Sequence, residues 1–321
     1  NTATTSFYAE GGGVYIGNGT NALENCSITG NTASSSGNAY GGGVHTAYGT
    51  NALTNCSIKD NTASSSSSAR GSGVYIGNGT STLESCSITS NTASSDDAYG
   101  GGVYITGSGT KTLLGKMTVT DNTVVVGSDS SANNMYFNSD KTVALSDGNG
   151  KTLSADSSIG VTTKTAPTEG NDVQFATSAT EEMKACFKPD SDSYVVSYKD
   201  ECLYLSVKPI YSDLYYKDGN FYSDSTCTNS TGMTKLSEAV LNMASTGTIH
   251  MMGQYSSTGS EETTVPAGKN ITVVRDESFK DASMFSITGG TFTVNATDTT
   301  SSITFDGQKI ETTVEKGGAF Y

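Results

Sequence analysis

Residues 11–40 read GGGVYIGNGTNALENCSITGNTASSSGNAY, and residues 41–70 read GGGVHTAYGTNALTNCSIKDNTASSSSSAR. Residues 71–99 repeat the pattern one residue shorter, and a degraded copy begins at Gly100. Self-similarity at a fixed period of this length indicates a solenoid, in which each copy forms one coil that packs on the next. Apolar positions recur at a spacing of 30, which shifts by one residue in the fourth copy: Val14, Val44 and Val74, then Val103; Leu23, Leu53 and Leu83; Ile28, Ile58 and Ile88, then Val119.

Each copy contains two or three short segments of alternating side chains and no helical period. In VYIG, valine and isoleucine share one face and tyrosine takes the other, as a strand requires. Stacked copies can bury that apolar face if each strand pairs with its equivalent one coil on, about 4.8 Å away. We therefore predict a right-handed parallel β-helix of about 30 residues per coil, because a left-handed one is typical of a shorter, hexapeptide-based period.

The corners of the predicted coil are marked by two recurrent features. A glycine run opens each copy, and glycine tolerates the positive φ and close backbone approach of a tight corner. An asparagine recurs before Thr-Ala or Thr-Val, where side-chain amides can hydrogen-bond along the stack: Asn31, Asn61, Asn91 and Asn122. The serine-rich stretches 34–40, 64–70 and 94–99 are expected to be variable turns on one side.

A leucine-rich repeat is the main rival fold. Leu23, Cys26, Ile28, Asn31 and Ala33 partly satisfy its pattern. That fold needs a second apolar element in each repeat, often helical, whereas the remaining half of this repeat, GGGVYIGNGT, is typical of another strand. The repeat therefore favours the β-helix.

Composition and charge limit the classes of partner. The chain has 321 residues and a formal net charge of −14, from 18 Lys+Arg and 32 Asp+Glu. Such a surface cannot replace the counterions of nucleic-acid phosphates, so we expect no nucleic-acid partner. It also disfavours an anionic membrane, and the lack of a long apolar run predicts no direct membrane insertion in this segment.

The chain is expected to contain two β-helix segments. The first, 1–208, comprises the repeats and a closing hairpin in SYVVSYKDECLYLSV; TEEMKACFK before it is expected to form a short helical turn. A Tyr-rich linker or hairpin, 209–225, carries the turn signal Asp218-Gly219. A second segment, 226–321, begins with a predicted helix in LSEAVLNM after Thr234, whose apolar stripe suits a cap over the open end of a new β-helix.

The motifs NCSITGNTA and GGGVY closely resemble the repeats of bacterial surface right-handed β-helix proteins, including polymorphic outer-membrane proteins and adhesin-like proteins. The capping segment KLSEAVLNMASTGTIHMMG is similar to the start of the same proteins. The resemblance covers most of the chain. It implies an extracellular rod with an adhesive or scaffolding role, and it carries no catalytic residues to this sequence.

Both ends of the chain fall inside a repeat. Asn1-Thr2-Ala3 aligns with Asn31-Thr32-Ala33, and Gly317-Gly318-Ala319-Phe320-Tyr321 looks like the start of a new coil. We expect this sequence to be part of a longer surface protein.

The six cysteines divide into two groups. Cys26, Cys56 and Cys86 share one ladder position, which Met117 takes in the fourth copy, and we expect them to fill the core as thiols. Cys186 and Cys202 flank the predicted hairpin and the turn before it, and they are the candidate disulfide pair. Cys227 would then stay single.

The sequence offers little material for catalysis or metal binding. Only two histidines occur, His45 and His250. The β-helix enzymes that cleave polysaccharides need acids converging from neighbouring coils, but Glu24 aligns with Thr54 and Glu84. The densest acidic cluster, Asp190, Asp192, Asp200 and Glu201, is interpreted as a solvated loop. We predict no catalytic, cofactor or metal site.

Tyr15, Tyr75 and Tyr104 form an outward column, interrupted by His45, that could offer an aromatic face to sugars or a partner protein. We therefore predict a non-enzymatic, extracellular, structural or adhesin-like segment of a larger surface protein. Its partners would be other protein chains, neighbouring modules, or host glycans or proteins. The alternatives are a filament subunit and a carbohydrate-active β-helix enzyme such as a polysaccharide lyase, a hydrolase or a tailspike.

Overall fold

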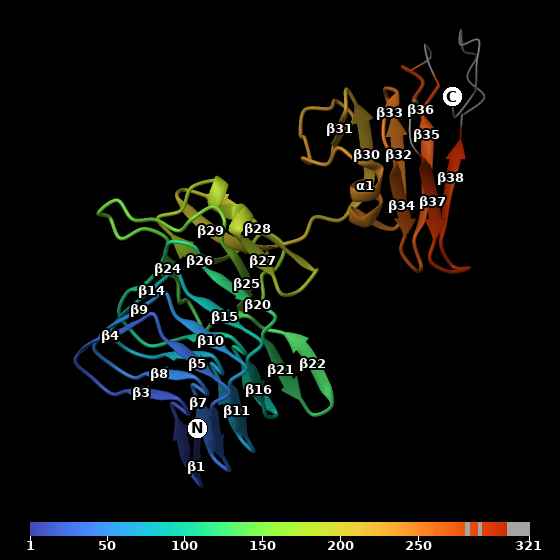
Figure 1. Cartoon of the computed structure of the whole chain (residues 1–321). Helices are drawn as coiled ribbons and strands as arrows, with labels where there is room; N and C mark the ends of the chain where they lie inside the picture. Colours follow the sequence, from blue (N-terminus) through green and yellow to red (C-terminus); the bar gives the residue numbers. More distant parts are fainter. Residues whose placement is uncertain (280–282, 288–290, 307–321) are drawn as a thin grey trace. The chain divides into compact units, whose positions relative to one another are not determined.

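A computed structural model describes residues 1–279, 283–287 and 291–306 (Figure 1). The chain divides into two compact units, residues 1–208 and 209–321. We call these unit 1 and unit 2 and describe each by itself. Residues 317–321, where we expected a new coil to begin, lie outside the described residues. No helix in the described part of the chain has the length and apolar character needed to span a membrane.

The first complete coil of unit 1 contains more strands than the repeat pattern indicated. Residues 11–40 form five strands: β3 (Val14–Ile16), β4 (Thr20–Glu24), β5 (Ser27–Thr29), β6 (Thr32–Ser35) and β7 (Asn38–Tyr40). The last of these lies in the serine-rich stretch that we expected to be a variable turn. That expectation was wrong because the stretch buries an alanine, Ala39, instead of a large apolar side chain.

The other coils of unit 1 repeat this arrangement. The partial coil before it contributes β1 (Thr2–Thr5) and β2 (Tyr8–Glu10). The second coil has β8 (Val44–Thr46), β9 (Thr50–Thr54), β10 (Ser57–Lys59), β11 (Thr62–Ser65) and β12 (Ser68–Arg70). The third has β13 (Val74–Ile76), β14 (Thr80–Glu84), β15 (Ser87–Thr89), β16 (Thr92–Ser94) and β17 (Asp97–Tyr99). The fourth has β18 (Val103–Ile105), β19 (Lys111–Leu114), β20 (Thr118–Thr120) and β21 (Thr123–Val126), followed by β22 (Asp129–Ala132).

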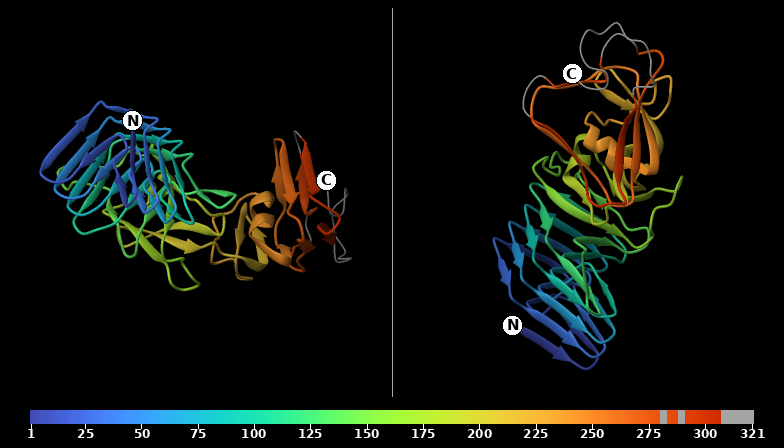
Figure 2. Two further views of the ribbon diagram at one scale, coloured as in Figure 1. Left: turned by 90° about the horizontal axis from the view of Figure 1, so that it is seen from below. Right: turned by 90° about the vertical axis from the view of Figure 1, so that its right-hand side faces the viewer.

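Equivalent strands pair in parallel, in register, one coil apart (Figure 1 and Figure 2). Val14 lies opposite Val44, which lies opposite Val74, and the offset is one repeat at each step. The predicted parallel β-helix is therefore confirmed. Identical side chains stack inward at every level, with isoleucines 28, 58 and 88 in one ladder and alanines 33, 63 and 93 in another.

The glycine corners allow this close stacking. Gly41 has a φ of 62°, in the left-handed region. A Cβ on Gly42 would lie 2.7 Å from the carbonyl oxygen of Ser72, and a Cβ on Gly43 would lie 2.6 Å from that of Gly73, both one coil on. The run is therefore needed at this corner because the backbones of adjacent coils leave no room for side chains.

The C-terminal part of unit 1 closes the stack. It contains β23 (Met135–Phe137), β24 (Val143–Ala144), β25 (Ser158–Thr163), β26 (Val173–Thr177), the 3-10 helix η1 (Glu182–Cys186), β27 (Phe187–Pro189), β28 (Tyr194–Lys199) and β29 (Cys202–Val207). The predicted helical turn and the β28–β29 hairpin are both confirmed. Strand β25 pairs with both β20 and β23, so it joins two ladders that are separate in the repeats.

Unit 2 contains a second set of parallel, stacked strands. It contains β30 (Tyr211–Lys217), β31 (Asn220–Tyr222), the helix α1 (Leu236–Asn242), β32 (Met243–Met251), β33 (Tyr255–Ser257), β34 (Glu261–Val265), β35 (Asn270–Arg275), β36 (Phe285–Ile287), β37 (Phe292–Ala296) and β38 (Ser302–Asp306). Tyr255 pairs with Phe285 at an offset of 30, like the coils of unit 1.

The stretch 209–225 is part of unit 2 and not a separate linker. It forms the β30–β31 hairpin around Asp218-Gly219, as predicted, but β30 also pairs in parallel with β32. Helix α1 buries Leu236, Ala239 and Val240 in the core of this unit. The ammonium group of Lys269 caps the C-terminal end of the helix by donating to carbonyls that include that of Leu241, at 2.9 Å.

Candidate functional site

Two columns of side chains face each other along the outside of unit 1. The corner column comes from the residue just before each glycine run: Glu10, Tyr40, Arg70 and Tyr99. The tyrosine column comes from the middle of the strand just after it: Tyr15, His45, Tyr75, Tyr104 and Tyr136. The glycine corner turns the chain between the two strands, so both columns line the same outer angle of the coil.

The two columns interleave with an offset of one coil. Tyr40 stacks on Tyr75 with ring centroids 4.9 Å apart. In the next coil, the guanidinium of Arg70 lies over the Tyr104 ring, 5.5 Å from its centroid. Tyr99 then packs on Tyr136 at 4.7 Å. In each of these three pairs, the tyrosine-column partner lies one coil beyond the column member that directly follows the corner residue in the chain.

This interleaving corrects the expectation of an open tyrosine face. Tyr104 is only 2% exposed, and Tyr75 is half-buried. Among the three predicted residues, only Tyr15 keeps a large exposed fraction, 52%. Burial also raises the pKa of Tyr75 to about 12, so the stacked phenols stay neutral. The tyrosine column is outward-facing but largely covered by the corner column.

His45 is the one non-tyrosine member of the tyrosine column within the repeats, and it is almost completely buried. Its ring packs between Tyr15 at 5.2 Å and Tyr75 at 4.6 Å. Burial lowers the pKa of His45 to about 4, so the imidazole is neutral at neutral pH. Its Nδ1 atom has no hydrogen-bond partner among the described residues.

Glu10 is the only acidic member of the corner column. Its Oε1 atom lies 3.9 Å from Nδ1 of His45, too far for a hydrogen bond. The described part of the chain offers it no lysine or arginine partner. Partial burial raises the pKa of Glu10. The result is a half-buried carboxylate beside aromatic rings, with only a neutral imidazole nearby.

A surface hollow of about 320 Å³ opens where these residues meet. It crosses the tyrosine column and reaches the turns that follow it, and we call it the aromatic groove. Tyr48, from one of those turns, is 57% exposed. The groove is lined by Glu10, Tyr15, Tyr40, His45, Ala47, Tyr48, Tyr75, Gly77, Asn78, Thr106 and Gly107.

In the coils next to the groove, the guanidinium group of Arg70 lies on the outer face and contacts both a carboxylate and an aromatic ring. The Nη2 atom of Arg70 donates to Oδ2 of Asp97 at 2.9 Å, while its guanidinium covers the Tyr104 ring. The Arg70 guanidinium lowers the pKa of Asp97 against the opposing effect of burial. A carboxylate and an aromatic face together bind guanidinium at this place.

Buried asparagines form a second feature, a ladder through the core side of the stack. Each Nδ2 donates to the Oδ1 of the next coil: Asn31 to Asn61, Asn61 to Asn91 and Asn91 to Asn122, all at 2.9 Å. Each Oδ1 also accepts the backbone N–H of the preceding asparagine. The predicted amide stacking at this corner is therefore present in every described repeat.

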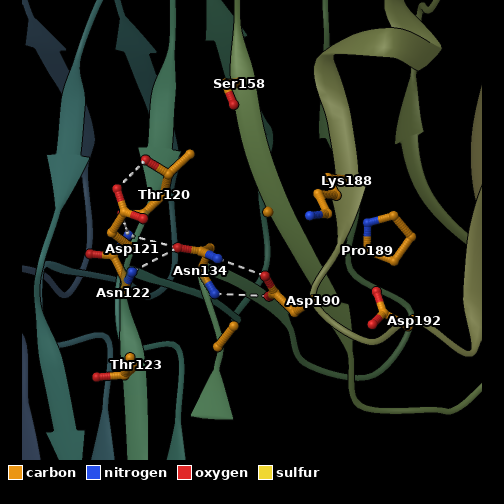
Figure 3. A pocket seen from close by; sticks show the side chains of 12 residues that line it. Thr120, Asp121, Asn122, Thr123, Asn134, Ser158, Lys188, Pro189, Asp190 and Asp192 are labelled. Carbon is orange, nitrogen blue, oxygen red and sulfur yellow. Dashed lines mark hydrogen bonds between the residues drawn. The ribbon is translucent and has the colours of Figure 1, made fainter. Parts of the chain in front are cut away.

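The asparagine ladder ends on Asp190 (Figure 3). Asn122 donates to Asn134 at 3.1 Å, and Asn134 donates its amide to Oδ1 of Asp190 at 2.6 Å. Oδ2 of Asp190 accepts from the backbone N–H of Asn134 and from the Thr162 hydroxyl. Asp190 is therefore not part of a solvated acidic loop, because both of its carboxylate oxygens accept hydrogen bonds from residues of unit 1.

A hollow of about 340 Å³ lies beside the end of the ladder. Figure 3 shows Lys188 and Asp192 at its rim, with Asp121 on the opposite side. Of the other predicted cluster members, Asp200 and Glu201 form the turn of the β28–β29 hairpin. Within the described residues, no three His, Cys, Asp or Glu side chains gather as a metal-binding group.

The predicted thiol ladder lies in the core of unit 1. Cys56 and Cys86 are buried, and Cys26 is partly buried against the same core. The Sγ atoms of Cys56 and Cys86 donate to the carbonyls of Leu23 and Leu53, one coil back, at 3.3 Å. Burial raises the pKa of Cys86 to about 12, which keeps the thiol protonated and unreactive.

The predicted disulfide between Cys186 and Cys202 does not form in the structure, where both are free thiols. Cys186 ends the 3-10 helix and is buried, with its Sγ atom 3.5 Å from the carbonyl of Ser154. Cys202 begins β29, and its Sγ atom accepts from Nε2 of Gln174 at 3.2 Å. Cys186 leads into β27, which pairs with β25, whereas Cys202 lies in β29, which pairs with β26 and β28 in another sheet. Cys227 is also free, with Sγ 3.6 Å from the sulfur of Met252.

His250, in unit 2, makes a surface contact. Its ring stacks on Tyr215 with centroids 4.6 Å apart, and Nε2 lies 3.3 Å from Oδ1 of Asp213.

The corner column is the part of the site that the sequence-based prediction missed. A signal was present, because Glu10, Tyr40, Arg70 and Tyr99 all stand directly before a glycine run. Their identities change from copy to copy, so they do not form a ladder of identical residues. Only their shared position in the repeat could have identified them.

Comparison with known protein families matches residues 1–161 to the right-handed β-helix region family. No curated protein and no solved structure matches the chain. The matched segment contains all four repeats and reaches β25. The β-helices of this family are right-handed, in agreement with the handedness predicted from the length of the repeat. Because the match spans half of the 321 residues and the strands stack as described, the chain belongs to the right-handed β-helix family.

Proposed function

We propose that this chain is a non-enzymatic, extracellular segment of a larger surface protein, which holds the aromatic groove on a stiff, soluble support. The observation that carries this proposal is the in-register stack of unit 1, whose buried polar side chains bond from coil to coil. Such a stack is rigid along its length and leaves its outer side free to meet other molecules.

The distribution of acids favours a binding or structural role over hydrolysis. Polysaccharide hydrolysis needs two carboxyl groups held about 5 to 10 Å apart around a bond. In unit 1, Asp97 is paired with Arg70, Glu84 is paired with Lys151, and Asp190 is engaged by Asn134 and Thr162. These three carboxylates are engaged in ion pairs or hydrogen bonds within unit 1. The side chains at the outer angle of the coil are mainly tyrosines.

Two further features support an extracellular setting. The net charge of −14 favours solubility as an isolated surface module. The thiols of Cys56 and Cys86 are buried with raised pKa values, which protects them from oxidation outside the cell. The expected partners are other protein chains, neighbouring modules of the same protein, or host glycans and proteins.

Surface labelling tests the location. An antibody against unit 1 should label intact, unpermeabilised producing cells, and protease added outside should remove the label. Labelling that appears only after permeabilisation would contradict the proposal.

A cleavage assay tests the non-enzymatic role. The full chain, incubated with a panel of neutral and acidic polysaccharides, should release neither new reducing ends nor unsaturated products. If the chain released product from any polysaccharide of the panel, and replacement of the groove carboxylate in Glu10→Gln abolished that release, the chain would be a carbohydrate-active enzyme instead.

A further inference from the structure

The aromatic groove contains an unbalanced charge. Glu10 is a partly buried carboxylate whose side chain is 35% exposed, and its ion-pair contact in the described structure is a neutral imidazole at 3.9 Å. A carboxylate in a partly desolvated place gains most from a cationic partner that also donates hydrogen bonds.

The rings around Glu10 suit a cation. The faces of tyrosine rings carry negative partial charge and attract ammonium or guanidinium groups placed over them. Tyr15 and Tyr48 are more than half exposed, and both line the groove with Glu10. The Nδ1 atom of His45, buried and without a hydrogen-bond partner, adds a neutral polar atom to the same lining.

The protein itself shows how such a cation is held. Two coils beyond Glu10, in the same column, Arg70 places its guanidinium over Tyr104 and bonds Asp97 at 2.9 Å. The groove around Glu10 has the same two elements, a carboxylate and exposed tyrosine rings, but it has no arginine of its own. Arginine suits the arrangement better than lysine because its planar group both stacks on rings and pairs with a carboxylate.

We propose that the aromatic groove binds the guanidinium group of an arginine side chain presented by a partner protein, with Glu10 accepting its hydrogen bonds and the rings of Tyr15 and Tyr48 packing on its plane. The net charge of −14 attracts basic partners over a longer range. The inference rests on the proposed binding role of this module, for which it names the partner chemistry.

The test titrates the full chain with two short peptides, acetyl-Gly-Arg-Gly-amide and the same peptide with citrulline in place of arginine. Citrulline keeps the shape of the side chain but has a neutral urea group. NMR signals of the Tyr15 and Tyr48 rings, assigned with the variants Tyr15→Phe and Tyr48→Phe, report binding. We expect saturable shifts with the arginine peptide, with a dissociation constant on the order of 1 mM or weaker for so small a contact.

Matched variants locate the carboxylate. Glu10→Gln should weaken the arginine peptide about tenfold, because it removes the charge-assisted bonds. Glu24→Gln changes an exposed glutamate of the neighbouring coil and should leave the affinity unchanged. Unchanged core methyl signals show that each variant is folded.

Equal affinity for the citrulline peptide, or unchanged affinity in Glu10→Gln, would overturn the inference. Saturable shifts with methyl glycosides and none with the arginine peptide would overturn it in favour of a sugar-binding face. These outcomes leave the surface-labelling and cleavage tests unaffected, so a failure here is distinct from a failure of the proposed function.

Discussion

His45 shows how one substitution within a repeated position changes the chemistry of the site. The equivalent residues in the other repeats are tyrosines, which stay neutral whether buried or exposed. An imidazole at this position is held neutral by burial between Tyr15 and Tyr75, with Tyr40 and Glu10 also beside it. The unfolded chain exposes the same imidazole to water, where it protonates near pH 6.5.

We therefore predict a pH-dependent stability that His45→Tyr removes. The pKa of His45 is lowered to about 4 in the folded state, so between about pH 6.5 and pH 4 the unfolded state binds more protons. The free energy of unfolding of unit 1 should fall by roughly 2 kcal/mol from pH 7 to pH 4.5 because of this residue. Urea titrations followed by NMR signals of unit 1 measure it.

The other histidine supplies the control for this prediction. His250→Tyr changes unit 2 and should leave the pH dependence of unit 1 as it is. Protonation of Glu10, whose pKa is raised, acts in the opposite direction in wild type and variant alike. A His45→Tyr chain that loses as much stability as wild type between the two pH values would show that the imidazole is not held neutral.

At the scale of elements, the large apolar positions could be predicted from the sequence and the small polar ones could not. VYI and SIT strands carry valine and isoleucine ladders that stand out at a period of 30. In strands β7, β12 and β17 the only buried apolar residue is a small alanine, Ala39, Ala69 or Ala98, so hydrophobic alternation gives almost no signal there. The end of the asparagine ladder was hidden for another reason, since Asp190 lies 56 residues from Asn134 and outside the repeat.

Asn91 lies in the middle of the asparagine ladder, and we predict that it is among the most sensitive polar residues of unit 1. Its amide donates to Asn122 and to the carbonyls of Ile58 and Thr89, and its oxygen accepts twice from Asn61. Asn91→Ala leaves several of these buried groups without partners. At about 1–3 kcal/mol for each unsatisfied group, the loss of unfolding free energy should reach about 3 kcal/mol or more.

Asn149→Ala is the matched control, because that asparagine is exposed in a loop and its side chain bonds only the nearby carbonyl of Asp147. It should change stability by less than about 0.5 kcal/mol. Urea denaturation measures both variants. Similar losses in the two variants would show that the ladder does not stabilise the stack.

On the scale of the whole chain, each unit has its own apolar core and its own set of parallel ladders. Residues 1–208 are closed by the β28–β29 hairpin, and the strands of unit 2 begin at Tyr211. Ile210, in the short connection between them, is 70% exposed. The sequence predicted a boundary after residue 208 from the hairpin and turn signals on either side of it, and the two compact units divide at Lys208 and Pro209.

We predict that a protease of broad specificity cuts the folded chain first within residues 207–211. An extended, exposed segment between two compact units fits a protease active site without local unfolding. Mass spectrometry should find two main fragments, each of which resists further digestion, whereas urea-denatured chain should be cut throughout. First cuts spread through the coils of unit 1 would contradict this division.

The coil-to-coil register has a consequence for how such a chain can change its length. From Asn31 to Asn91, the paired strands and the hydrogen bonds between side-chain amides join residues that are 30 apart. The DNA that encodes such near-identical copies can undergo unequal recombination, in which one copy aligns with the next. Loss of residues 41–70 would join Tyr40 to Gly71, so a tyrosine would again precede a glycine corner and Asn31 would face Asn91. Such recombination can thus lengthen or shorten unit 1 by whole coils while the β28–β29 hairpin that closes its C-terminal side is kept.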